Sequence, residues 1–248
     1  DYVDGYAVDY HYSDNNFIPA PGAWWKASKE HRALKSAFLI QPNRPRTKKQ
    51  LRTMIALGYA SGAHVIAPWD AYIHGGERLF GDPADYADLY GFARALGQFG
   101  LLNGYEDAAV GGYDLTENRY GKTVPIAVSG GSGKLSVYGR AKPGEAQAAL
   151  VFHLVESATG GEAQVKLHRA ASTQIGAGPL RCRLLTPVPY GKAVHTRAES
   201  SKNHAALAQS RVLTPRREGD MLVIDVPPLT PWAVLIITPA DNRHPTQP

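Results

Sequence analysis

Residues 56–94 read ALGYASGAHVIAPWDAYIHGGERLFGDPADYADLYGFAR, and this stretch decides the fold class of the first part of the chain. A helix ends, an apolar run at 63–67 follows, and an Asp-Pro pair at 82–83 opens a second helix. Alternation of strands and helices implies parallel strands joined by helical crossovers. The same alternation extends upstream, where we expect strands and a helix at 6–10, 34–40 and 47–60.

The two helices carry recognisable end signals and apolar faces. Thr47 is placed to cap the first helix and Gly62 to stop it. Apolar or small residues recur with helical spacing, which predicts one buried face for each helix. In the first helix these residues are Leu51, Met54, Ile55 and Gly58, and in the second they are Tyr86, Leu89, Phe92, Ala93 and Leu96.

The pattern changes after residue 123 to short alternating runs separated by Gly, Pro and polar turns. Seven such runs without helices predict an antiparallel β-sandwich over 123–248. Residues 101–122 show no clear period and are expected to form a connecting loop. The stretch SGGSGK at 129–134 lacks phosphate-loop spacing and is predicted to be a hairpin turn. The seven runs lie at 124–128, 134–141, 148–155, 163–170, 180–186, 221–226 and 232–238.

Composition places the chain among globular proteins and narrows its partners. The 248 residues include 27 Lys and Arg against 22 Asp and Glu, and the basic residues spread through the whole sequence. This distribution gives little support to a nucleic-acid-binding patch. The lone Cys182 lies in an apolar alternating run and is expected to be a core residue. No run is long enough to span a membrane, and the start at Asp1 within a strand-like run suggests a truncated N-terminus.

Polar and aromatic residues follow each of the three predicted parallel strands. In a (β/α) barrel, the carboxyl ends of the strands build the active site. Carboxylates can act there as acid, base or nucleophile, while aromatic rings stack on sugars and other polar groups bind hydroxyls. The candidate catalytic residues are Asp9 and Asp70, and the candidate substrate-binding residues are His11, Gln41, Asn43, Arg44, Trp69, Tyr72 and His74.

Each candidate also has a structural explanation. Asp9 could close a strand end, Asp70 could cap a turn through its own backbone, and Trp69 could cover the core. His11 is equally suited to a structural hydrogen bond. No metal-ligand spacing, GxSxG elbow or GxGxxG fingerprint occurs, so an enzyme without metal or cofactor is the simplest enzymatic hypothesis.

Residues 56–94 resemble the last barrel strand, active-site loop and final helix of clan A glycoside hydrolases. AALVFHLVES at 148–157, LLTP at 184–187 and DMLVIDVPPLTPWAVLIIT at 220–238 resemble the all-β domain that follows the barrel in many of these enzymes. The resemblance implies that residues 1–100 are the C-terminal portion of a (β/α)8 barrel, followed by an accessory β-sandwich. It also implies hydrolysis of O-glycosyl bonds in a poly- or oligosaccharide by a secreted or periplasmic enzyme.

The chain departs from the clan A pattern at one position. If 63–67 is the eighth barrel strand, then 34–40 is the seventh, and the residue expected to be a nucleophilic Glu is Gln41. The departure implies carboxylates placed elsewhere, an inactive relative or a different strand count. The acid/base that clan A places after the fourth strand would lie upstream of Asp1, so the chain alone is expected to hold half a site.

Two further hypotheses stay open beside the glycosidase. The predicted sandwich could be a non-catalytic carbohydrate-binding module, which usually requires exposed aromatic residues, or it could simply support the barrel. The aromatic residues that bear on this choice are Tyr138, Phe152, Tyr190 and Trp232.

Overall fold

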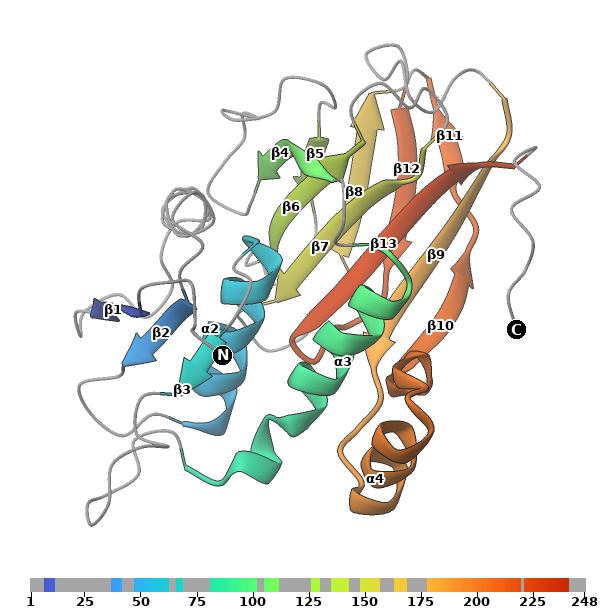
Figure 1. The fold of residues 1–248 in the computed structure, drawn as a ribbon. Helices are drawn as coiled ribbons and strands as arrows, with labels where there is room; N and C mark the ends of the chain where they lie inside the picture. The colour runs from blue at the N-terminus through green and yellow to red at the C-terminus, as the bar shows by residue number, and fades with distance from the viewer. Residues whose placement is uncertain are drawn as a thin grey trace.

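The computed structural model combines helices with one parallel and two antiparallel sheets (Figure 1). None of the helices in the described part of the chain is long and apolar enough to cross a membrane. The structure describes residues 7–11, 37–41, 47–62, 66–68, 81–101, 105–111, 126–129, 135–142, 148–156, 163–168, 178–219 and 221–240.

The N-terminal strands form a three-stranded parallel sheet. Strands β1 (Ala7–His11), β2 (Ala37–Gln41) and β3 (Ile66–Pro68) lie side by side in chain order. Helix α2 (Lys48–Ala60) connects β2 to β3. The predicted parallel strands with a helical crossover are therefore confirmed for these three strands.

Both predicted helices form, and their end signals act as expected. The Thr47 side chain accepts a hydrogen bond from the Gln50 amide, and the Gln50 side chain accepts one from the Thr47 amide, a complete capping box. Gly62, just beyond the helix, has a φ of 104°, a conformation that glycine tolerates best. Asp82 caps the 3-10 turn η2 (Pro83–Asp85), which leads into α3 (Ala87–Gln98).

The C-terminal part forms two antiparallel sheets. The six-stranded sheet has the order β10-β9-β13-β7-β6-β4, and the four-stranded sheet has the order β11-β12-β8-β5. All seven predicted strands are present, as β5 to β9, β12 and β13, and the described part of the chain adds three that were not predicted, β4, β10 and β11. The strands are β4 (Glu106–Gly111), β5 (Ile126–Ser129), β6 (Leu135–Ala141), β7 (Leu150–Glu156), β8 (Ala163–His168), β9 (Leu180–Pro187), β10 (Ala208–Leu213), β11 (Arg216–Glu218), β12 (Met221–Val226) and β13 (Trp232–Pro239).

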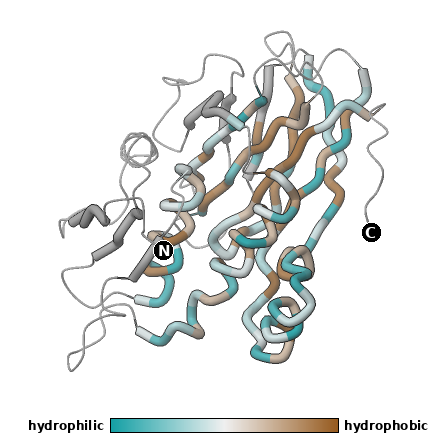
Figure 2. Tube along the Cα trace, viewed as in Figure 1, coloured by the Kyte–Doolittle hydropathy of each residue, from teal (hydrophilic) through white to brown (hydrophobic). Residues whose placement is uncertain are grey.

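The central strands β7 and β13 of the six-stranded sheet are buried on both faces. Alternate residues of these strands belong to two different hydrophobic clusters. On β13, Ala233 and Leu235 join Leu222 and Ile224 of the four-stranded sheet. This explains why the strand sequences are almost continuously apolar (Figure 2), since neither face meets water.

Helices α2 and α3 cover the opposite face. One cluster unites Met54 and Leu57 of α2 with Phe92 of α3 and with Trp232 and Val234 of β13. The Phe92 ring meets the Trp232 ring edge-on, with 4.8 Å between the ring centroids. The crossover helix of the parallel sheet and the antiparallel sheets therefore share one core.

The structure differs from the sequence prediction in several connections. Strand β4 lies within the predicted loop 101–122, and helix α4 (Lys192–Ser201) with the 3-10 turn η4 (His204–Leu207) lies in a region predicted to be all β. The predicted hairpin at 129–134 is wrong, because β5 pairs with β8 while β6 pairs with β4 and β7. Local turn residues cannot reveal that the chain changes sheets there.

A buried ion pair joins α2 to α3. The Arg52 guanidinium donates to both carboxylate oxygens of Asp88 at 2.6 Å each. It also donates to the carbonyl oxygens of Asp85 and Thr230, so it links η2 and the segment before β13. The side chains of Arg52 and Asp88 are only 16% and 8% exposed, which makes the contact costly to break.

Replacing Arg52 with Met is expected to lower the free energy of unfolding by about 3 kcal/mol, because Asp88 is left largely buried without its partner. Chemical denaturation monitored by circular dichroism measures the change. Lys48→Gln is the matched control, since it removes the exposed ion pair between α2 and η2, Lys48 with Asp85, and should cost less than about 0.5 kcal/mol. Equal losses in both variants would contradict the role given to Arg52.

Candidate functional site

The carboxyl ends of the three parallel strands are aligned. His11, the last residue of β1, is the Cα partner of Gln41, the last residue of β2. Ile40 is in turn the partner of Pro68, which ends β3. His11 and Gln41, which end β1 and β2, therefore lie at one edge of the sheet, the edge where open α/β sheets and barrels bind their ligands.

Three of the nine candidate residues lie within the described part of the chain. The backbone positions of Asp9, His11 and Gln41 lie in β1 and β2, with Asp9 two residues before the strand end and opposite Leu39. The remaining candidates lie outside the described residues, so their roles stay predictions. They are Asn43, Arg44, Trp69, Asp70, Tyr72 and His74.

Helix α2, which follows β2, is anchored at its C-terminal end by Arg140 of β6. The Arg140 guanidinium donates to the carbonyl oxygen of Ala60, the last residue of the helix, at 2.6 Å. This bond satisfies a carbonyl that lacks a partner within the helix and places a positive charge at the negative end of its dipole. Together, Arg52 and Arg140 hold both halves of the crossover helix against the antiparallel sheet.

His153 is the buried partner of Arg140. Its Nε2 lies 3.3 Å from an Arg140 nitrogen. Because guanidinium can only donate, Nε2 is the acceptor and the ring proton is on Nδ1. Burial, and secondarily the charge of Arg140, hold the pKa of His153 well below its usual value.

His153 also belongs to an aromatic stack. Its ring lies parallel to that of Trp232 at a centroid distance of 5.8 Å, and Trp232 stacks on Tyr59 of α2 at the same distance. A neutral, fully buried imidazole enclosed in this way cannot reach a substrate. The arrangement is a structural joint between α2 and the sheet.

The contact between Arg140 and His153 was not predicted from the sequence, although the sequence marks both residues as unusual. Arg140 and His153 each interrupt an apolar strand, in KLSVYGRA and AALVFHLV. Charged and polar residues in such positions are rare unless they are paired. The pairing itself could not be inferred, because it joins β6 to β7 and to a helix 80 residues upstream.

Within the described residues, no three His, Cys, Asp or Glu side chains lie close enough to hold a metal ion. The predicted core position of Cys182 is confirmed, since the residue is buried and joins the cluster between the antiparallel sheets. Burial raises the pKa of its thiol to about 12, which keeps it protonated and unreactive at neutral pH.

His153 should make the folded protein sensitive to acid. Below pH 6.5 the unfolded chain binds a proton at this residue that the folded protein excludes, so stability falls as the pH falls. Between pH 7 and pH 5, the free energy of unfolding should fall by about 2 kcal/mol more in the wild type than in His153→Gln, as measured by chemical denaturation at each pH. Between pH 7 and pH 8 the two proteins should show the same pH dependence, and parallel curves down to pH 5 would refute the assignment.

Of the comparisons with known proteins, only the one with solved structures finds a match. No protein-family model matches the chain, and no curated protein matches it. Among solved structures, the fold is similar to the crystal structure of an α-amylase from H. orenii, with a TM-score of 0.38 and 11% sequence identity. The match covers 88% of this chain and 47% of the α-amylase chain, so the chain spans about half the length of that protein.

Proposed function

We propose that the chain is part of a glycoside hydrolase that cleaves O-glycosyl bonds in a poly- or oligosaccharide. Residues 1–100 would supply the last strands of a (β/α)8 barrel, and the two antiparallel sheets would form its accessory β-sandwich. The observation that carries the proposal is the alignment of the strand ends, with His11 opposite Gln41 and Ile40 opposite Pro68. In the sequence, a segment rich in polar and aromatic residues ends or follows each of these strands.

The proposed chemistry uses two carboxyl groups and needs no cofactor. One protonates the departing glycosidic oxygen, while the other attacks the sugar carbon or activates the attacking water. Asp9 in β1 and Asp70 after β3 are the candidates that this chain supplies. Trp69 would stack on the sugar ring and Gln41, in the place of a nucleophile, would hydrogen-bond to a hydroxyl. We further propose that the enzyme is secreted or periplasmic, where polymeric glycans are found.

Asp9→Asn and Asp70→Asn in the full-length natural enzyme should each lower kcat by about 100-fold or more, because each removes a group that transfers a proton or attacks. Release of reducing sugar from a panel of glycans measures the effect. Asp85→Asn is the control, because Asp85 lies in the partly exposed surface pair with Lys48 and should leave hydrolysis unchanged. Unchanged hydrolysis in both site variants would remove Asp9 and Asp70 from the mechanism.

A supporting role for the antiparallel sheets is favoured over glycan binding by their own aromatic residues. Tyr138, Phe152 and Trp232 are buried in the two clusters, and of these four aromatic residues only Tyr190 is exposed. The face that carries Trp232 is occupied by α2 and α3. The sheets thus serve as the packing partner of the crossover helix.

A segment of residues 120–248 alone should fail to fold as a soluble monomer, because it lacks the helices that cover Trp232 and Val234 as well as strand β4. Sedimentation and binding of a hydrophobic dye measure this, with the whole chain as control. A soluble monomer with cooperative unfolding and no dye binding would support an independent module instead.

A further inference from the structure

In the described part of the chain, the two antiparallel sheets end in four edge strands, and three of these are poor templates for pairing. Strand β11 has only the three residues RRE, and β5 has only four residues. Strand β4 begins with Glu106 and Asp107, and its pairing with β6 shifts register between Asp107 and Ala109. Short length, charge and bulges are devices by which proteins prevent association of sheet edges.

Strand β10, the fourth edge, is longer and more regular. All six of its residues pair with β9 without a shift in register. Four consecutive residues at 209–212 are exposed, and Arg211 is the only charged residue of the strand. Val212 is 78% exposed, the highest value for a large apolar side chain among the described residues. The outer side of β10 therefore offers a template on which another strand can pair.

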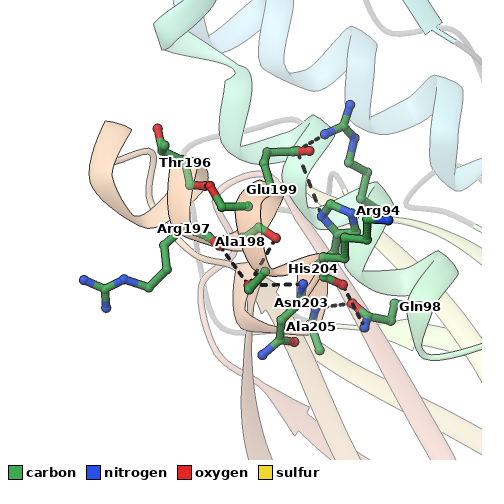
Figure 3. A network of polar contacts seen from close by, with 12 residues as sticks. Arg94, Gln98, Thr196, Arg197, Ala198, Glu199, Asn203, His204 and Ala205 are labelled. Carbon is green, nitrogen blue, oxygen red and sulfur yellow. Dashed lines mark hydrogen bonds and ion pairs between the residues drawn. The ribbon is translucent and has the colours of Figure 1, made fainter.

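Helix α4, which lies between β9 and β10 in the chain, does not cover this edge. It is docked with η4 onto α3, as Figure 3 shows. Glu199 of α4 pairs with Arg94 of α3, and the Gln98 side chain of α3 accepts a hydrogen bond from the Ala205 amide of η4. The helix is thereby held against α3, and the middle of β10 stays open to solvent.

The side chains of β10 alternate between the two faces of the sheet. Ser210 is the Cα partner of Leu185, which packs in the cluster that contains α2 and α3. Arg211 is the partner of Leu184, which packs between the two antiparallel sheets. Alternation along the strand assigns the other positions. The helix side carries Ala208, Ser210 and Val212, and the opposite side carries Gln209 and Arg211.

The sequence of β10 is complementary to itself in one antiparallel register. Opposite residues of an antiparallel pair lie on the same face, so two identical strands pair symmetrically only about an axis through one residue and its own copy. An axis through Ser210 pairs five residues, 208–212. It places Val212 opposite Ala208, which gives the exposed apolar side chain an apolar neighbour. It places Arg211 opposite the neutral Gln209.

The other symmetric registers are less favourable. An axis through Arg211 also pairs five residues, 209–213, but it sets two guanidinium groups directly opposite each other. An axis through Gln209 or Val212 pairs only three residues of the strand. Length and charge together therefore select the register centred on Ser210.

We propose that the chain forms a two-fold symmetric homodimer through β10, in which the two six-stranded sheets join into one continuous sheet. Figure 1 shows β10 on the side of this sheet away from β1, β2 and β3, so the pairing leaves the edge of the parallel sheet uncovered. Because a single strand of each copy pairs, the dimer is reversible and dissociates on dilution. The inference does not depend on the proposed glycosidase function.

Disulfide crosslinking of the whole chain tests the register. At the axis, the Cα atoms of residue 210 in the two copies would lie about 4.5–5.5 Å apart, a distance that a disulfide spans. Ser210→Cys should therefore form a covalent dimer under mild oxidation, seen on a non-reducing gel. Val212→Cys is the matched control and should stay monomeric, because its two copies would lie roughly 14 Å apart although the position is 78% exposed. The buried Cys182 is present in both variants.

Sedimentation equilibrium measures the dimer without a crosslink. The wild type should pass from monomer to dimer as its concentration rises. Ser210→Lys should raise the dissociation constant about tenfold or more, because two like charges meet at the axis. Ala84→Lys adds the same charge at an exposed position of η2 and should dimerise like the wild type. Circular dichroism should show the same fold in both variants, since both side chains are exposed.

Several outcomes would overturn the proposal. A wild-type chain that stays monomeric up to its solubility limit would exclude the dimer. Equal crosslinking of Ser210→Cys and Val212→Cys would exclude the register, since random collisions would then explain both products. Equal dissociation constants for Ser210→Lys and Ala84→Lys would place the contact elsewhere, and growth beyond a dimer would show that another edge also pairs.

Discussion

The burial of the central strands of the six-stranded sheet on both faces is the constraint on which the rest of the structure depends. Strands β7 and β13 present apolar side chains to both faces, so each face requires a cover. The four-stranded sheet covers one face, and α2 with α3 covers the other. Because α2 is also the crossover of the parallel sheet, the burial that stabilises the antiparallel strands also fixes the strands that carry the candidate site.

Polar contacts refine this apolar packing at a few positions. Arg52 binds two backbone carbonyls and the Asp88 side chain, and Arg140 binds the Ala60 carbonyl and the His153 side chain. Both arginines connect elements that are far apart in the sequence. Hydrogen bonds are directional, so they fix the relative position of elements that hydrophobic contacts alone would not define. They explain how α2 holds a defined position on the sheet.

The sequence by itself determined the elements whose signals are local. The Thr47 cap, the Asp82-Pro83 start and the seven apolar strands could all be predicted, because capping and periodicity depend on neighbours within a few residues. The predicted parallel strands also imply that the ends of β1 and β2, His11 and Gln41, are aligned, and Asp9 lies two residues before the end of β1. The roles of these residues and of Asp70 stay predictions.

Only the tertiary structure decided which faces the strands bury and which charges meet. Strand β4, the passage from β5 to β6 between sheets, and helix α4 are set by pairings between distant residues, which leave no local pattern. The same is true of the joint between Arg140, His153 and Ala60.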